Sequence, residues 1–301
     1  MKPLLITLAL AISIIGTSCD VIEGPYEKNP IVPVDTTLRD TSSTVVSTGG
    51  LQHVLLEDYT GHTCGNCPEA ADVAAKIYAD NNGRVIVTAI HAGGFAVVEP
   101  PDFVRDLTCP AGVALDQAFR ISRAGNPNGL VNRVTLNNRI IQGMKNWEPA
   151  VAQLLPLQPV VDLALSHTYY PERRTVIVTV RATALQNIDA STNISVWLQE
   201  NGIIGDQKDY RRTPSHIEDY EFEHVLRTSF NGTWGDTLNP TPVPKGTVIT
   251  RTVRYEIPAE KLNTADTLNV WTLKNCELVA FAHKASTTRE VLQVVKQKFV
   301  P

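Results

Sequence analysis

The sequence predicts an α/β domain followed by an all-β domain, behind an export segment and a linker. In residues 51–157, short apolar runs typical of buried strands alternate with segments of helical period. From residue 159 onward, strand-like runs are separated by turn residues without helical patterns between them. Hydrophobic residues make up 43% of the 301 residues and charged residues 19%, which favours globular domains over a disordered or multi-span chain.

The composition also argues against several classes of protein. Nineteen prolines and eighteen glycines are too many for a coiled coil or an all-helical bundle. The formal net charge is −4, from 27 basic and 31 acidic residues. That balance supplies no basic surface for a phosphate backbone, so we expect no nucleic-acid partner.

Residues 1–18 have the pattern of a bacterial export signal. Lys2 precedes an apolar run at 4–15, which is too short to span a membrane, and small residues follow. The Cys19 that comes next resembles the cysteine of a lipobox, although Gly16 stands where leucine is usual. The resemblance implies that Cys19 is lipidated and begins the mature chain. The alternative is ordinary signal cleavage, with Cys19 left as a free thiol.

Residues 19–50 are expected to form a flexible tether. This stretch is rich in proline, serine and threonine and ends in Gly49-Gly50, so it cannot bury enough apolar surface to fold alone. Two or three acyl chains on Cys19 would hold the following domains at a membrane. No other segment is long and apolar enough to span one.

The α/β domain is expected at residues 51–157. Its predicted elements are a strand at 54–59, a helix from Glu69 that stops at 81–83, a strand at 85–90, a helix opened by Cys109-Pro110, a hairpin after Pro127 that turns at Asn137-Asn138, and a closing helix at 147–155. The pair Cys64 and Cys67 lies at the first strand-to-helix junction. The dipole and free N–H groups of a helix N-terminus favour a thiolate there.

This order of elements resembles thioredoxin. An acidic residue six positions before the first active-site cysteine is typical of that family, and Asp58 stands there; Pro127 fits its cis-proline. The resemblance implies thiol–disulfide exchange, with Cys64 as nucleophile and Cys67 as resolving thiol. It also implies that Asp58 relays a proton to Cys67 and that Pro127 borders the partner's groove. The sequence departs from the family at Thr63, in the long stretch 93–108, and at 66–68, which read Asn-Cys-Pro.

Other interpretations of these residues remain open. The Cys64/Cys67 pair could be a fixed structural disulfide or, with further ligands, part of a metal site. Asp58 could be an ordinary strand-end residue, and His62 and His91 are more readily explained as loop residues than as catalysts. Four cysteines remain after Cys19, and the last two, Cys109 and Cys276, could bridge each other as a structural disulfide or stay separate buried thiols.

The second domain, at residues 159–301, is predicted to be an immunoglobulin-like β-sandwich. Seven or eight short strand candidates occur at 160–167, 175–182, 194–198, 223–228, 248–255, 268–273, 278–282 and 291–299, with turn residues between them. The sequence shows no nucleophile–base pair or phosphate loop here. A group of His and acidic residues at 216–224 is interpreted as a solvated loop rather than a metal site.

The mature chain resembles a family of Bacteroidota outer-membrane lipoproteins named after a twenty-eight-kilodalton member. The resemblance rests on GNPNGLVNR at 125–133, EHVLR at 223–227 and GTWGD at 232–236, with weaker support from VLQV at 291–294. It implies a lipid-anchored protein of the outer membrane, in a leaflet that it leaves open.

We therefore hypothesise a lipid-anchored envelope protein that exchanges disulfides with envelope proteins through Cys64 and Cys67. The alternative is a surface lipoprotein that binds a protein or glycan partner and uses the cysteine pair as a stabilising bond. We expect no cofactor and no metal ion under either hypothesis.

Overall fold

The computed structural model describes residues 41–188, 191–262, 268–286 and 288–301. The expected signal at 1–18, Cys19 and most of the tether lie outside the described residues. The end of the expected tether is not flexible. Strands β1 (Thr41–Ser42) and β2 (Val46–Ser47) both pair antiparallel with β6 (Val161–Tyr170).

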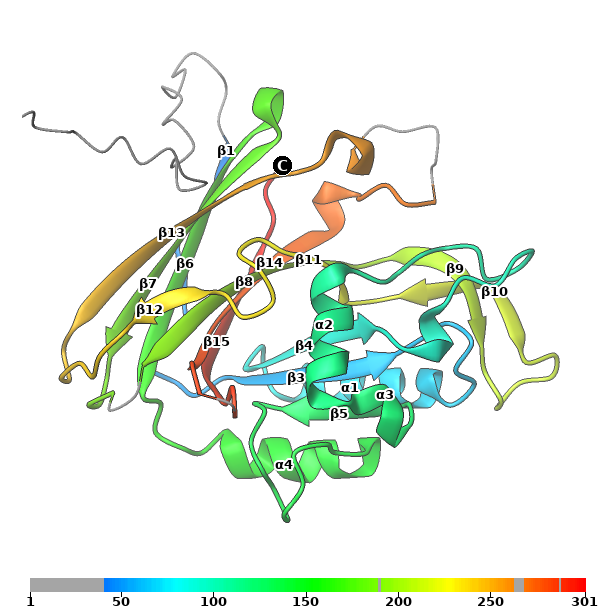
Figure 1. The fold of residues 1–301 in the computed structure, drawn as a ribbon, viewed down its shortest axis with the longest axis horizontal. Coiled ribbons are helices and arrows are strands. Elements are labelled where there is room, and N and C mark those ends of the chain that lie inside the picture. Colours follow the sequence, from blue (N-terminus) through cyan, green and yellow to red (C-terminus); the bar gives the residue numbers. More distant parts are fainter. Residues whose placement is uncertain (1–40, 189–190, 263–267, 287) are drawn as a thin grey trace, which may run out of the picture. The chain divides into compact units, whose positions relative to one another are not determined.

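The α/β part begins with two parallel strands joined by a helix (Figure 1). Strand β3 (Val54–Thr60) pairs in register with β4 (Val85–His91), and α1 (Cys67–Asp80) connects them. Both faces of β3 are buried, which explains its continuous apolar run. Helix α1 buries Ala70, Ala74 and Ile77, the period expected for one covered face.

The rest of the α/β part follows the predicted order. Two helices, α2 (Pro110–Phe119) and α3 (Ile121–Ala124), precede β5 (Asn128–Val131), which pairs antiparallel with β3. Leu136 and Arg139 bridge across the predicted turn, where Asn137 and Asn138 both have positive φ. Helix α4 (Trp147–Leu154) closes this part, after the short 3₁₀ turns η1 (Gly94–Ala96) and η2 (Met144–Asn146).

The remainder of the described chain is built from strands. They are β7 (Thr175–Ala184), β8 (Thr192–Glu200), β9 (Ile203–Lys208), β10 (His216–Phe222), β11 (Val225–Ser229), β12 (Asp236–Asn239), β13 (Val248–Glu256), β14 (Cys276–Lys284) and β15 (Val291–Lys298). Short 3₁₀ turns occur at η3 (Pro171–Arg173), η4 (Ala259–Lys261) and η5 (Leu273–Asn275). The predicted strand at 268–273 does not form, and the predicted loop at 216–224 contains β10.

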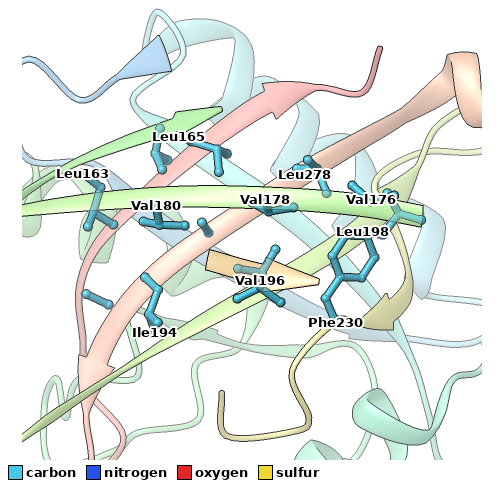
Figure 2. Packing of buried hydrophobic residues seen from close by; sticks show 14 of the residues in the cluster. Leu163, Leu165, Val176, Val178, Val180, Ile194, Val196, Leu198, Phe230 and Leu278 are labelled. Atoms are coloured by element: carbon cyan, nitrogen blue, oxygen red, sulfur yellow. The ribbon is translucent and has the colours of Figure 1, made fainter. Parts of the chain in front are cut away.

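Two sheets pack face to face as a sandwich. One contains β1, β2, β6, β7 and β13, and it covers β8, β14 and β15 of the larger sheet. Aliphatic side chains from both sheets interdigitate between them, including Leu163, Val178, Val196 and Leu278 (Figure 2). The alternation of inward residues along these strands explains the period-two pattern of the sequence.

The larger sheet is continuous across the expected domain boundary at 157–159. Its order is β15-β14-β8-β11-β4-β3-β5, and β12 pairs with β8. Strand β11 makes the connection, because Val225 pairs with Ala89 of β4 on one side and with Glu200 of β8 on the other. The two expected domains therefore share one sheet.

Helices cover both faces of the α/β end of this sheet. On one face, α1 and α4 pack over a cluster that includes Leu56 and Trp147. On the other face, α2 and α3 pack over a cluster that extends from Leu55 to Trp197 and Phe281 of the sandwich strands. These layers fix the end of β3, from which the cysteine loop extends, and the end of β4 beside it.

Candidate functional site

Cys64 and Cys67 form a disulfide in the loop between β3 and α1, with their Cα atoms 5.4 Å apart. The Cys64 amide donates to the carbonyl of Gly61, and the Cys67 amide donates to that of Cys64. Helix α1 starts at Cys67 itself, with Pro68 in its first turn. The helix therefore begins two residues before Glu69, where the sequence predicted its start, and it includes Cys67. Each cysteine is only 2% exposed.

Asp58 lies on β3, on the chain segment that leads into this loop. Its side chain is 3% exposed, and Oδ1 has no hydrogen-bond partner among the described residues. Burial raises the pKa of Asp58 from its ordinary 3.8 to about 7, because the charged form loses its hydration. A buried carboxyl with this pKa can bind and release a proton near neutral pH.

His91 and Pro127 both lie at the end of the central strands where the cysteine loop begins. Thr60, at the end of β3, pairs in register with His91, at the end of β4. Pro127, joined to Asn126 by a cis peptide bond, comes just before Asn128, which opposes Tyr59. Pro127 therefore lies at the same end of the strands as the start of the cysteine loop.

The side chains of His91 and Asn126 at this end are unsatisfied. Both ring nitrogens of His91 and both amide atoms of Asn126 are buried without a hydrogen-bond partner among the described residues. Burial lowers the pKa of His91 from 6.5 to about 3, helped by the neighbouring His62 and Arg227. Buried polar groups without partners are rare in folded proteins and concentrate at sites with a function.

The β9–β10 hairpin contacts the cysteine loop directly. The backbone amide of Lys208 donates to the carbonyl of His62 at 2.8 Å, and that of Tyr210 donates to the carbonyl of Gly65 at 2.8 Å. The side-chain amide of Gln207 donates to the carbonyl of Cys64 at 3.1 Å. This contact was not predicted from the sequence.

Side chains of the hairpin reach α1 and β3 as well. Arg211 Nη1 lies 2.7 Å from Asp72 Oδ2 on α1, and Arg211 also forms an ion pair with Asp209. Burial raises the pKa of Tyr220 to about 12, with a contribution from the charge of Asp58. Tyr220 of β10 is thus close enough to Asp58 for the two groups to interact electrostatically.

A row of rings connects the cysteine loop, the 93–108 stretch and the hairpin. His62 stacks on Phe103 with ring centroids 5.6 Å apart, and Phe103 lies 5.0 Å from the ring of His216 on β10. His216 Nε2 is 2.7 Å from Asp206 Oδ1 on β9. His62 itself is buried and hydrogen-bonds the carbonyl of Val97. These contacts give His62 and His216 structural partners.

Cys109 and Cys276 are separate free thiols, both buried, so the possible bridge between them does not form. Cys109 caps α2, and its sulfur accepts from the amide of Gly112. Burial raises the pKa of both thiols. A buried thiol with a raised pKa is a poor nucleophile, which argues against a redox role for either.

A buried ion pair between β3 and the chain after β5 was also not predicted from the sequence. Arg133 and Glu57 form a two-bond ion pair at 2.8 and 2.9 Å, with both side chains at 0% exposure. Three aromatic rings surround the guanidinium, those of Phe119, Trp197 and Phe281. The pair joins β3 to the sandwich strands, because two of these rings come from β8 and β14.

No group of three or more His, Cys, Asp or Glu side chains in the described part of the chain is arranged to hold a metal ion. None of the helices that the structure describes is long and apolar enough to cross a membrane.

Comparisons with known proteins identify a matching family and proteins of similar fold. Residues 114–301 match the family described as outer membrane protein Omp28. The fold is similar to that of HBP35 of Porphyromonas gingivalis, with a TM-score of 0.60 at 15% identity over 83% of this chain and 76% of that one. A crystallographically solved protein of Agrobacterium tumefaciens is 12% identical, with a TM-score of 0.47 over 82% of this chain and 93% of that one. Among curated proteins, none matches.

Proposed function

The chain belongs to the outer membrane protein Omp28 family, and we propose that it is an envelope protein that exchanges disulfides with other envelope proteins. Family membership implies an outer-membrane or cell-envelope location. The exchange function does not rest on the family, since the match begins at residue 114, after Cys67. It rests on the residues between β3 and α1.

The observation that carries the proposal is the Cys64–Cys67 disulfide at the entry to α1. The surrounding topology supports a thioredoxin-like arrangement. Strand β3 lies between β4, which is parallel to it, and β5, which is antiparallel, and the loop before β5 contains Pro127. Helices lie on both faces of these strands.

The proposed reaction transfers two electrons between this pair and a partner. In the oxidised form, a partner thiolate attacks the Cys64 sulfur, the Cys64–Cys67 bond breaks, and a mixed disulfide with Cys64 forms. A second partner thiolate then attacks its own sulfur in the mixed disulfide and releases Cys64. The partner is oxidised to a disulfide, and Cys64 and Cys67 are reduced to thiols. The reverse sequence reduces a partner's disulfide.

Asp58 is proposed to move the proton. When the disulfide opens, Cys67 leaves as a thiolate, and a carboxyl with a pKa of about 7 can supply a proton to it at neutral pH. In the reverse direction the carboxylate accepts the proton of the Cys67 thiol. Pro127 is proposed to border the surface on which the partner lies.

Insulin reduction and equilibration with glutathione test this function. The wild-type protein, reduced beforehand, should accelerate insulin precipitation and show a definable reduction potential. Cys64→Ser should lose both properties, whereas Cys109→Ser should keep them, because Cys109 is a buried helix cap outside the pair. A wild-type protein that neither reduces insulin nor equilibrates with glutathione would contradict the proposal.

A second function is favoured by the 2% exposure of both cysteines, which is what a purely stabilising disulfide would show. In that case the protein binds a protein or glycan partner. Replacing both cysteines with serine then lowers stability by about 2 kcal/mol, as expected for a short closed loop, and leaves partner binding intact. Under the first proposal the same double variant loses its exchange function.

Lipid anchoring through Cys19 is part of the proposal. Cells grown with a radiolabelled fatty acid should incorporate label into the wild-type protein and not into Cys19→Ser. Label that persists in Cys19→Ser would place the lipid elsewhere and refute this anchor.

A further inference from the structure

Residues 207–211, which we call the cover, lie against the cysteine loop at the tip of the β9–β10 hairpin (Figure 1, yellow-green). The amides of Lys208 and Tyr210 donate to the loop, two residues apart, as alternate residues of a strand do. Between them, the amide of Asp209 faces away from the cysteine loop and donates to the carbonyl of Ser215. The cover therefore docks on residues 62–65 as an added extended segment would.

The ring of Tyr210 occupies the space next to Gly65. A Cβ built on Gly65 would come within 2.6 Å of three atoms of that ring, so only glycine permits this approach. Tyr210 is still 60% exposed, and the ammonium of Lys208 lies over its ring, 5.6 Å from the ring centroid. The cover thus contacts Cys64 and Gly65 directly, and both cysteines of the disulfide are only 2% exposed.

The base of the hairpin is held more firmly than its tip. Ile203 and Phe222 at the base are buried in one cluster with Leu107 and Val225. The tip is fixed to α1 by Arg211 and Asp72, whose side chains are 44% and 69% exposed. An ion pair this exposed contributes little, and a two-stranded sheet is marginal by itself. The tip can therefore open while the base stays packed.

We propose that the cover is a displaceable segment that closes the Cys64–Cys67 disulfide and occupies the position that an extended segment of a partner polypeptide takes during exchange. The partner's identity rests on the proposed function. The closing of the disulfide does not, because it is a property of the chain by itself.

Reduction by dithiothreitol tests the closing directly. One thiolate of the reagent attacks a cysteine sulfur, the protein disulfide breaks, and the reagent's second thiol closes it into a cyclic disulfide. The two cysteines leave as thiols, which mass spectrometry counts after alkylation. We expect the wild-type disulfide to be reduced at least tenfold more slowly in buffer than in urea, because in-line attack must wait for the cover to open.

Three variants loosen the cover from both sides. Arg211→Ala removes the pair with Asp72 and the pair with Asp209 inside the cover. Tyr210→Ala removes the ring, and Gly65→Ala pushes the ring away from the loop. Each should speed reduction by roughly fivefold, the effect of about 1 kcal/mol on the opening equilibrium. Arg212→Ala is the matched control, because the Arg212 side chain is 65% exposed and forms its ion pair with Asp209 rather than with α1. It should behave like the wild type.

Loss of overall stability is excluded by a variant of the sandwich core. Val178→Ala, in the cluster between the two sheets, should lower the melting temperature without changing the reduction rate in buffer at room temperature. The proposal is overturned if the wild type is reduced as fast in buffer as in urea, or if the three cover variants match Arg212→Ala. If the cover variants react faster with dithiothreitol but no form reduces insulin, the cover stands and the exchange function fails.

Discussion

Replacing Asp58 with asparagine should stabilise the protein at alkaline pH and have little effect at acid pH. The side chain is buried, its Oδ1 has no hydrogen-bond partner among the described residues, and burial raises its pKa, so the charged form is disfavoured in the folded protein. Asparagine has the same shape and no charge. The substitution therefore removes only the ionisation of this group from the folded state.

The magnitude follows from the pKa. The unfolded chain ionises Asp58 at its ordinary 3.8, whereas the folded protein holds the proton until about pH 7. The folded state thus binds more protons than the unfolded state in this window, and stability falls as pH rises from 3.8 to 7. At about 1.4 kcal/mol per pKa unit, the full loss is about 4 kcal/mol above pH 7. Between pH 5 and pH 8 it is about 2–3 kcal/mol.

Urea unfolding of the oxidised wild type and Asp58→Asn at pH 5, 6, 7 and 8 measures this loss. Other titrating groups are common to both proteins and cancel in the difference between their free energies of unfolding. We expect that difference to grow by about 2–3 kcal/mol in favour of Asp58→Asn between pH 5 and pH 8. A difference that stays constant with pH would show that Asp58 is ionised in the folded protein and would refute the proton-relay role.

Three further predictions concern the other buried polar groups. Burial lowers the pKa of His91 to about 3, so the free energy of unfolding of the wild type should fall by about 2 kcal/mol more than that of His91→Leu between pH 7 and pH 5, measured by urea unfolding. Equal losses in the two proteins would mean that His91 is protonated in the folded state. Arg133→Met should lower the free energy of unfolding by about 3–5 kcal/mol, because it leaves Glu57 charged and unpaired, and adding Glu57→Gln should recover part of that loss. A double variant whose loss equals the sum of the losses of the two single variants would argue against the pair. Iodoacetamide at pH 8 should label Cys109 and Cys276 only after unfolding, because both thiols are buried with raised pKa values; fast labelling of either native thiol would contradict their burial.

Local patterns predicted the elements around the cysteine pair well. The buried strand that carries Asp58, the helix that stops at Asn81 and the turn at Asn137-Asn138 all depend on residues close in sequence. Such elements are decided by apolar period, by capping and by residues that tolerate positive φ, all of which are visible in a single chain. The predictions failed where pairing is distant. Residues 41–50 looked like a flexible tether because their partner strand, β6, lies more than 100 residues away.

The same distinction applies to the candidate site. Sequence alone determined that two cysteines three residues apart follow a strand with a buried acidic residue and precede a helix. Only the tertiary structure decided that Gln207 and Tyr210, more than 140 residues later, lie on that loop, and that Val225 joins two expected domains into one sheet. The physical reason is that backbone N–H and C=O groups are the same in every residue, so hydrogen bonds between distant segments leave no periodic trace in the side chains. The chemistry of this site is therefore set locally, and its accessibility is set by contacts that the fold creates.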